Sequence, residues 1–320
     1  MTARALQEMP SLAAIRDAVA AEVSKVVVGQ EAALDVLLAA LSVGGHVLLE
    51  GVPGVGKTLL ADATARALGM EFRRMQFTPD MLPSDITGTM TLLGGELAFR
   101  PGPVFTNLLL ADEVNRTPPK TQAALLEAMQ ERQVSVEGTP RPLPDPFLVV
   151  ATQNPIEYEG TYPLPEAQLD RFLVKIDVTY PSEADEVALL RFAHRGVDPV
   201  TLDDVVAVAG PAQLRAARQE VDATTASEDL LRYVAAIVRR TRSLPSVALG
   251  ASPRAAVHLL AASKAAARLA GRSFVTPDDV VGMAAPVLRH RLLLRAEAEL
   301  ERYRPDEAVA TAVAAVAVPR

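Results

Sequence analysis

The 320-residue chain contains no cysteine, which excludes disulfide frameworks, thiolate zinc sites and cysteine nucleophiles. It also has no excess of positive charge. Its 32 Lys and Arg stand against 39 Asp and Glu, and the net charge of −7 disfavours binding of nucleic acid by bulk charge. Aromatic residues make up 4% of the chain, which is few for stacking against bases. A reducing compartment fits the lack of cysteine.

Long uncharged apolar segments are missing too. The longest uncharged stretches, Val36–Leu49 and Ala308–Pro319, are shorter than the roughly 20 residues that a membrane helix needs. The first residues carry a charge every few positions, without the apolar centre of a signal peptide. We therefore expect a soluble, cytoplasmic protein with no membrane span.

Apolar residues make up 49% of the chain, which is enough to bury a full core. The length of the chain favours two domains. The first half alternates short apolar runs with helical segments, as in an α/β fold with helices on both faces of a parallel sheet. The helical segments include Lys57–Gly69 and Pro118–Arg132, the latter with Thr117 as its expected N-cap. Five runs are expected strands: His46–Glu50, Glu71–Gln76, Asn107–Ala111, Phe147–Ala151 and Phe172–Val178.

The second half is almost wholly helical in pattern. We expect an α/β domain over residues 1–195 and an all-α domain over residues 196–320. Ser252 and Thr276 each precede a proline, which is typical of helix N-caps, and Gly271 stands where a C-terminal glycine belongs. The expected helices are 183–194, 211–220, 228–242, 254–270 and 277–290.

A glycine-rich segment joins the first expected strand to a helix. It fits the pattern G-x-x-x-x-G-K-S/T, with an apolar strand before it and a helix after it. Glycines let successive backbone N–H groups point at phosphate oxygens, and the helix N-terminus adds its dipole. Lys57 would reach the β- and γ-phosphates, and the Thr58 hydroxyl would ligate Mg²⁺. The sequence predicts a nucleotide-binding loop at Gly51, Val52, Pro53, Gly54, Val55, Gly56, Lys57, Thr58 and Leu59.

Polar side chains end two other apolar strands. Asp112 and Glu113 follow Leu108-Leu-Leu-Ala, where a P-loop fold supplies a Mg²⁺ ligand and a base for the attacking water. An acidic helix N-cap after a strand is the simpler alternative. Asn154 ends Phe147-Leu-Val-Val-Ala-Thr-Gln-Asn and could bond the γ-phosphate or the water. From the pattern alone, a structural Asn-Pro turn is favoured for Asn154.

Two arginines stand at helix boundaries. Arg171 lies between a short helix and the last expected strand, and Arg254 lies in the first turn of a later helix. A cation at a helix start is mildly unfavourable, so Arg254 is expected to face an anion. Taken alone, a surface salt bridge is favoured for either residue.

The combined motifs change that balance. GVPGVGKT, LLLADEVNR, ATQNP, LPEAQLDRF and GASPRA, in this order and spacing, closely resemble the MoxR family of AAA+ ATPases over roughly residues 20–295. The resemblance implies that Gly51–Thr58 is the Walker A motif and that Asp112 and Glu113 form the Walker B motif. It further implies sensor 1 at Asn154, the arginine finger at Arg171, sensor 2 at Arg254, and a segment passing the adenine at Val28, Gly29 and Gln30.

Two short runs flank Gly94-Gly95 within Gly88–Arg100, which is a hairpin signal. An ordinary surface hairpin is one explanation. The segment also resembles the helix-2 insertion that MoxR proteins share with magnesium-chelatase ATPase subunits, where it points toward the pore of a ring. We favour the insertion because the hairpin stands where that family has it.

The remaining charged residues give weaker signals. His46, His194, His258 and His290 show no metal-ligand spacing. The Arg-rich segment Arg289–Arg295 is interpreted as a helix face that pairs with the acids that follow it, Glu297, Glu299 and Glu301.

The resemblance implies a fold, a reaction and partners. The fold is a P-loop AAA+ core, with a parallel five-stranded sheet sandwiched by helices, followed by an all-α lid. The activity is Mg²⁺-dependent ATP hydrolysis by a chaperone-like homo-oligomer, a hexameric ring, acting on a von Willebrand factor A-domain protein in its maturation or metal-cofactor insertion.

Two alternatives remain. One is a chelatase-type motor subunit, which a chelatase-like partner subunit in the genomic neighbourhood would favour. The other is a nucleic-acid-acting AAA+ regulator, which the acidic balance disfavours and a salt-dependent DNA titration would test.

Overall fold

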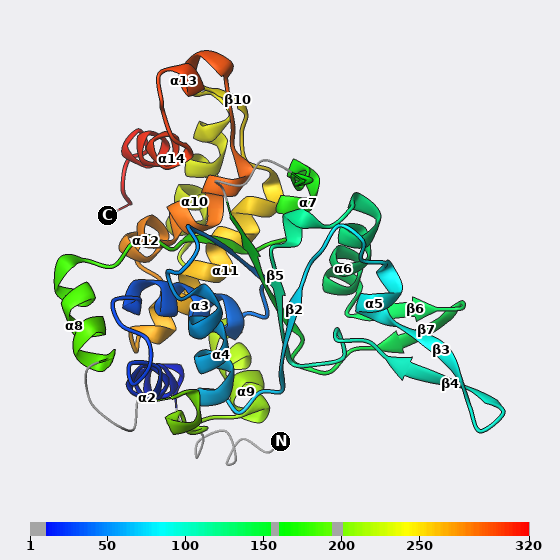
Figure 1. The fold of residues 1–320 in the computed structure, drawn as a ribbon. Coiled ribbons are helices and arrows are strands. Elements are labelled where there is room, and N and C mark those ends of the chain that lie inside the picture. Colours follow the sequence, from blue (N-terminus) through cyan, green and yellow to red (C-terminus); the bar gives the residue numbers. More distant parts are fainter. Residues whose placement is uncertain (1–10, 155–159, 194–200, 320) are drawn as a thin grey trace.

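The computed structural model describes residues 11–154, 160–193 and 201–319 (Figure 1). The expected domain boundary at residue 195, His194 and part of the segment after Asn154 lie outside the described residues. Among the helices that are described, none is both long enough and apolar enough to cross a membrane.

A five-stranded parallel sheet forms the centre of the molecule. Its strand order is β2-β5-β8-β1-β9, and each neighbouring pair is parallel. The expected strands are confirmed, with ends that differ by up to two residues. The carboxyl ends of β1, β5 and β8 meet at one edge of the sheet, where ligands bind in open parallel sheets. The strands are β1 Val47–Glu50, β2 Phe72–Gln76, β5 Leu108–Asp112, β8 Leu148–Gln153 and β9 Val174–Asp177.

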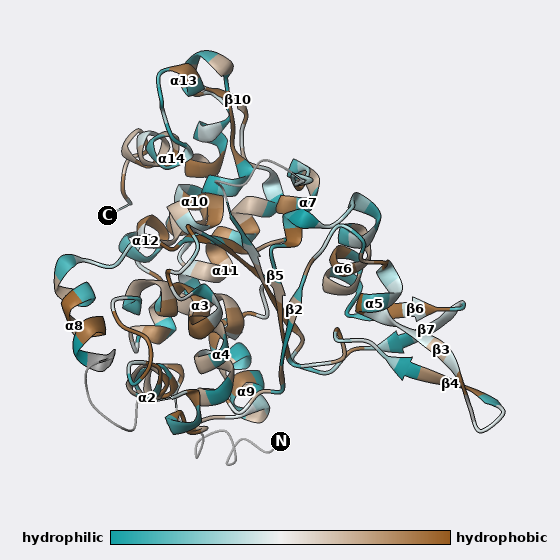
Figure 2. Cartoon of the chain, viewed as in Figure 1, coloured by the Kyte–Doolittle hydropathy of each residue, from teal (hydrophilic) through white to brown (hydrophobic). Residues whose placement is uncertain are grey.

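Successive side chains of these strands enter two different cores, because side chains alternate between the faces of a sheet. Leu49, Leu108 and Val150 pack into the larger core. Leu48 and Leu109, their neighbours, pack into the smaller one. Burial on both faces explains the continuous apolar runs of the central strands, which are brown in Figure 2, whereas the edge strand β2 is mostly teal.

Helices cover both faces of the sheet, as expected for this fold class (Figure 1). Residues of α2, α3 and α4 contribute to the larger core, and those of α5 and α6 to the smaller core. The expected N-cap at Thr117 is wrong: Pro118 is the N-cap of α6. Because a residue before proline is driven out of the helical region, Pro118 stays extended and the helix begins at Pro119. The bounds are α2 Leu12–Val23, α3 Glu31–Ser42, α4 Lys57–Ala67, α5 Pro83–Thr87, α6 Pro119–Glu131, α7 Glu166–Leu169 and α8 Glu183–Ala193.

Two hairpins extend side by side from the body, at the right of Figure 1. β3 (Gly88–Leu93) and β4 (Glu96–Pro101) form the hairpin expected from Gly94-Gly95, and both glycines have positive φ, as a type I′ turn requires. β6 (Gln133–Val136) and β7 (Thr139–Pro142) form a second hairpin that the sequence analysis did not predict. Two of its eight strand residues are prolines, which disguise a strand pattern.

The C-terminal half is helical, and its helices share the larger core with α2–α4. The expected caps at Ser252 and Gly271 are confirmed: Ser252 accepts a hydrogen bond from Ala255, and Gly271 has a φ of 74°. A two-stranded antiparallel pair, β10 (Val247–Leu249) and β11 (Leu293–Leu294), interrupts this otherwise helical region. The helices of this C-terminal half are α9 Pro211–Asp222, α10 Glu228–Thr241, α11 Pro253–Leu269, α12 Pro277–Leu288, α13 Ala296–Leu300 and α14 Pro305–Ala314.

The interpretation of Arg289–Arg295 as a helix face is wrong. Helix α12 ends at Leu288, and a 3₁₀ turn, Arg289–Arg291, leads into β11. Since this turn faces the core, its arginines pair with carboxylates that are distant in sequence instead of the acids that follow. Arg289 bonds Asp177 and Asp306, and Arg291 bonds Asp170.

Candidate functional site

The glycine-rich loop connects β1 to α4, and its backbone explains its composition. Gly54 and Gly56 have φ of 83° and 84°, in the left-handed region that favours glycine. A Cβ atom at either position would meet open space, so these glycines serve the curl of the loop and leave its inner face accessible. Gly51 serves close packing instead, because a Cβ there would collide with the carbonyl oxygen of Val178.

The loop borders a cavity of about 400 Å³, which is within the size range of small-molecule sites. The carboxyl ends of β5 and β8 form its other side. Most of the predicted site residues therefore come together, although they are spread over 100 positions of sequence. The lining residues are Pro53, Gly54, Val55, Gly56, Lys57, Thr58, Leu59, Asp112, Glu113, Thr152, Gln153 and Asn154.

Lys57 provides positive charge at this cavity. Its Nζ donates to the carbonyl oxygens of Gly51 and Val52, the latter at 3.1 Å. Burial lowers the pKa of Lys57, while the carboxylates of Asp112 and Glu113 oppose that shift. An ammonium group beside glycine N–H groups and a helix N-terminus forms a cradle suited to phosphate oxygens.

Asp112, at the end of β5, is 8% exposed and is held by two side chains. Thr152 Oγ1 donates to its Oδ1 at 2.6 Å, and the Arg74 guanidinium donates to its Oδ2 at 2.6 and 3.1 Å. Asp112 and Thr58 line the same cavity, so the oxygen donors that Mg²⁺ prefers are present together. The residues that line the loop cavity fit a magnesium–nucleotide complex.

Glu113 has an unusual backbone for a non-glycine residue, with φ of 56° and ψ of 49°. Left-handed residues of this kind occur at sites where the structure holds a side chain in place against its preference. The carboxylate of Glu113 accepts from Gln76 at 2.6 Å and pairs with Arg116 at 2.8 Å. Its backbone N–H donates to Thr152 Oγ1 at 2.9 Å.

The third predicted polar residue, Asn154, follows β8 and is 6% exposed at the edge of the cavity. Thr152 and Gln76 are site residues that the sequence analysis missed. Thr152 stands two positions before Asn154 in the same motif. The alternation of side chains along the strand does not by itself show that Thr152 faces Asp112 and Glu113. Gln76 ends β2, beside Asp112 in the parallel register, and that pairing is not visible in the sequence.

The two predicted arginines lie together in a second hollow, of about 200 Å³. Asp170, His258 and His46 also line it. Arg254 is half exposed and lies 3.7 Å from the Asp170 carboxylate, so it faces an anion, as its place in a helix start predicts. The structure thus places Arg254 beside Arg171, and their roles toward a nucleotide stay predictions.

The predicted adenine segment connects α2 to α3. Gln30 is the N-cap residue of α3, and Gly29 has a φ of 73°. A Cβ atom at Gly29 would come within 2.6 Å of the Asp185 carboxylate, so this segment packs closely against the first turn of α8. Val28, Gly29 and Gln30 are not among the residues that line the loop cavity. Their contact with adenine stays a prediction.

Comparisons with known proteins agree with this geometry. Residues 46–174 match the ATPase family associated with various cellular activities (AAA), and residues 239–312 match the AAA lid domain. The protein YeaC of Bacillus subtilis is 47% identical over 299 residues, covering 93% of this chain and 92% of YeaC. The chaperone MoxR1 of Mycobacterium tuberculosis is 44% identical over 311 residues, covering 93% of this chain and 81% of MoxR1.

A solved structure is similar over nearly the whole length. The crystal structure of a proposed ATPase from Cytophaga hutchinsonii superimposes with a TM-score of 0.88 at 42% identity, covering 96% of each chain. With the glycine-rich loop, the paired acids and the C-terminal lid in place, these similarities identify the chain as a member of the MoxR family of AAA+ ATPases.

Proposed function

We propose that this chain hydrolyses ATP with Mg²⁺ at the loop cavity and uses the reaction to remodel a partner protein. The observation that carries the proposal is the meeting of Lys57, Thr58, Asp112, Glu113 and Asn154 around one cavity. Lys57 would contact the β- and γ-phosphates, and Thr58 and Asp112 would hold the metal. Bound Mg²⁺ would neutralise charge on the phosphate oxygens.

Glu113 would act as the base that polarises the attacking water. Gln76 and Arg116 hold its carboxylate, while Thr152 fixes its backbone, so neighbouring residues of the same chain set the position of the base. Positioning of this kind supplies much of the rate enhancement in phosphoryl transfer, because there is little covalent chemistry for the protein to perform. Asn154 would hydrogen-bond the water or the γ-phosphate from the adjacent strand end.

The family resemblance supports a homo-oligomeric ring, with six subunits. In such a ring Arg171 would reach the ATP of the adjacent subunit as an arginine finger, and Arg254 would contact the γ-phosphate from the lid. A planar guanidinium suits this task because it neutralises charge on several phosphoryl oxygens at once. Movement of the lid against the sheet domain would then transmit hydrolysis to a partner.

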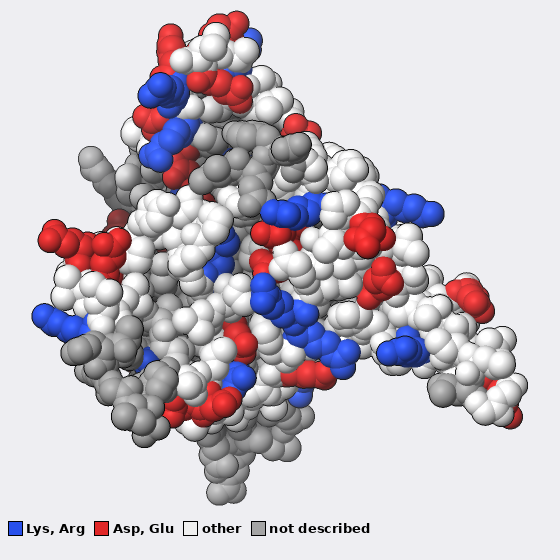
Figure 3. All heavy atoms as spheres, in the orientation of Figure 1, with Lys and Arg blue, Asp and Glu red and all other residues white. Residues whose placement is uncertain are grey.

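The partner we propose is a protein with a von Willebrand factor A domain, in its maturation or its metal-cofactor insertion. The β3–β4 hairpin supports a protein client, because it projects from the body and carries Leu92 and Leu97 with 72% and 67% of their surface exposed. Nucleic acid is a weaker candidate. On the face drawn in Figure 3, Lys and Arg are interspersed with Asp and Glu, without a broad basic surface.

The substitution Glu113→Gln tests the proposal. The amide keeps the volume of the side chain but loses the basicity needed to polarise water. We expect the variant to bind ATP normally by calorimetry, to lose nearly all hydrolysis, and to retain its client in pull-down experiments with ATP. Glu297→Gln, at an exposed position of α13, is the matched control and should hydrolyse ATP at the parental rate. Parental hydrolysis by Glu113→Gln would assign the base to another residue.

A further inference from the structure

Arg291 is a buried arginine of the lid, in the 3₁₀ turn after α12, and its side chain is 2% exposed. Its Nε lies 2.7 Å from the carboxylate of Asp170, which precedes β9 of the sheet domain. It also donates to the carbonyl oxygen of Phe172 at 2.5 Å and to that of Leu173 at 3.1 Å. A donation to the carbonyl oxygen of Val287 ties the same guanidinium to its own helix.

These contacts bracket Arg171 on both sides. Asp170 comes directly before it and Phe172 directly after it, and the Phe172 side chain is fully buried. A second lid residue, His290, lies 3.2 Å from the Phe172 carbonyl oxygen through its Nε2. Because the Asp170 carboxylate and the Phe172 carbonyl oxygen, on either side of Arg171, are bound to the lid, the direction of the Arg171 side chain depends on where the lid sits.

Local structure alone is too weak to hold this segment. The helix that leads to Arg171 is α7, Glu166–Leu169, a single turn of four residues. Isolated helices of that length are unstable, since the first turn costs more order than its hydrogen bonds return. The segment therefore takes its position from tertiary contacts, of which Arg291 supplies the largest number of hydrogen bonds described at Asp170, Phe172 and Leu173.

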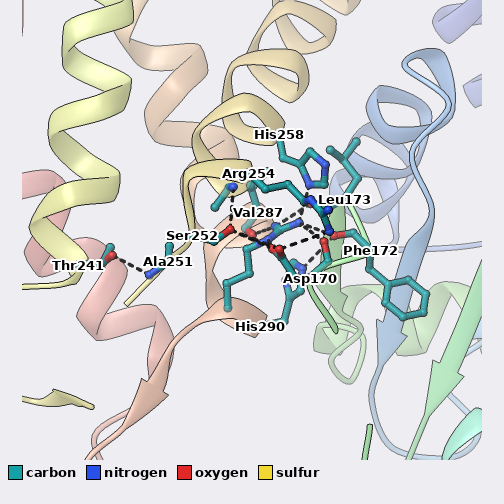
Figure 4. Close-up of polar contacts among 12 residues, drawn as sticks. Asp170, Phe172, Leu173, Thr241, Ala251, Ser252, Arg254, His258, Val287 and His290 are labelled. Atoms are coloured by element: carbon teal, nitrogen blue, oxygen red, sulfur yellow. Dashed lines mark hydrogen bonds and ion pairs between the residues drawn. The ribbon is translucent and has the colours of Figure 1, made fainter. Parts of the chain in front are cut away.

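Other lid groups converge on the same carboxylate. Ser252 Oγ lies 3.3 Å from Asp170, and Arg254 lies 3.7 Å from it, both from the start of α11. In Figure 4 the side chains of Ser252, Arg254 and His290 surround Asp170. His258, also on α11, lies 2.6 Å from Arg291 through Nδ1. Two lid segments, the start of α11 and the turn after α12, thus meet at one acidic residue of the sheet domain.

We propose that Arg291 is a positioning residue that couples the lid of one subunit to the arginine finger that this subunit presents to the next. The inference rests on the proposed function, in which Arg171 acts on the ATP of an adjacent copy of this chain. The Phe172 side chain stays in the smaller core, while lid movement in one subunit displaces the Asp170 carboxylate and the Phe172 carbonyl oxygen. This displacement changes the direction of Arg171. Nucleotide in one subunit thus sets the rate of hydrolysis in its neighbour, through a contact that lies within a single chain.

The substitution Arg291→Lys tests the coupling. Lysine keeps the charge but loses the fork that reaches Asp170 and the two backbone carbonyls at once. We expect the variant to bind ATP with parental affinity by calorimetry but to unfold at a lower thermal midpoint, because buried acceptors lose hydrogen bonds. Its activity is therefore measured well below that midpoint. Its kcat should fall about tenfold or more, since a displaced catalytic group costs up to about 100-fold in rate. Asp170→Asn breaks the same contact from the sheet domain and should show the same pattern, so a folding failure of the first variant does not remove the test.

Mixed rings separate this role from a purely structural one. Glu113→Gln is expected to bind ATP without hydrolysing it and has an intact finger, so adding it to Arg291→Lys should return part of the activity at interfaces where its finger serves the intact loop and base of Arg291→Lys. Adding Arg171→Ala to Arg291→Lys should return none, because both variants present a defective finger. Mixing Arg171→Ala with Glu113→Gln is the reference that establishes the finger itself. Subunit exchange is verified beforehand with labelled chains.

Arg289 provides the matched control. It lies in the same turn and bridges the lid to β9 through Asp177, but it does so away from Arg171. Arg289→Lys should keep the parental kcat. Equal losses of kcat in Arg289→Lys and Arg291→Lys would overturn the coupling alone. So would a loss in Arg291→Lys that Glu113→Gln cannot rescue while the reference mixture recovers. If the reference mixture fails as well, the trans finger is wrong and the coupling falls with it.

Discussion

Thr152 fixes Asp112 from the neighbouring strand: its Oγ1 donates to the Asp112 carboxylate at 2.6 Å. The same oxygen accepts the backbone N–H of Glu113 at 2.9 Å. Thr152 is 1% exposed, so this hydroxyl is shielded from water. One buried group therefore orients the expected metal ligand and the backbone of the expected base at the same time.

Removing the Thr152 hydroxyl should reduce ATP hydrolysis strongly while the protein still folds. In Thr152→Val, Asp112 loses one of its two orienting donors, with Arg74 remaining, and the Glu113 N–H loses its acceptor. We expect Mg²⁺-dependent hydrolysis to fall by about 10–100-fold, as for other partners of metal ligands. The free energy of unfolding should fall by about 1–3 kcal/mol, the cost of a buried polar group left unpaired. Magnesium titrations of activity and urea denaturation measure the two effects. Thr152→Ser keeps the hydroxyl and should retain most activity; equal losses in both variants would contradict the assignment.

Lys57→Ala should abolish nucleotide binding, because the loop loses its positive charge on the β- and γ-phosphates. Calorimetric titration with ATP measures the affinity directly. Lys120→Ala makes the same change of charge at an exposed position of α6 and should bind ATP as the parent does. An undiminished affinity in Lys57→Ala would remove this lysine from the site.

The sequence predicted the parts of the molecule that short, local patterns encode. The apolar runs of the five strands, the glycine-rich loop at Gly51–Thr58 and the hairpin at Gly94-Gly95 each lie within a few successive residues. Their meeting around one cavity follows from the parallel sheet, because neighbouring strands end at the same edge.

Contacts between distant residues could not be predicted in this way. Arg291 and Asp170 are 121 positions apart, and an arginine in a charged stretch is normally expected on the surface. Nothing in the local pattern distinguishes Arg291 from Arg295, which is exposed. The strand pair β10–β11 was not predicted for another reason. Strands of three and two residues are too short to show an alternating pattern.

The buried His46 should make stability depend on pH. Its Nδ1 accepts the Val149 N–H at 3.0 Å and its Nε2 lies 3.1 Å from the Met129 carbonyl oxygen, an arrangement that requires a neutral ring. Burial lowers the pKa of His46 to about 4 from an ordinary value of 6.5. Between these values the unfolded chain holds a proton that the folded chain does not, so stability falls as the pH falls.

His46 should contribute up to about 1.4 kcal/mol per pH unit to this slope, the value for one proton. Denaturant unfolding at several pH values between 7 and 4 measures it. His46→Gln has no titrating ring and should show a correspondingly shallower slope, although its stability at pH 7 will be lower. A slope that is unchanged by the substitution would show that His46 does not contribute to the pH dependence.

The tip of the β3–β4 hairpin should contact the client and not the nucleotide. Leu92 and Leu97 are directly opposite each other in the strand register, and most of each side chain is exposed. Replacing both by serine removes little buried surface, so the thermal midpoint and the basal ATPase rate should stay at the parental values. In the background of Glu113→Gln, the same double substitution should greatly reduce the amount of client recovered with the protein. Leu300→Ser is the matched control, because Leu300 is 85% exposed but lies on α13, at the top of Figure 1, far from the hairpin. Equal client recovery from the hairpin variant and from Leu300→Ser would rule out the hairpin as the contact.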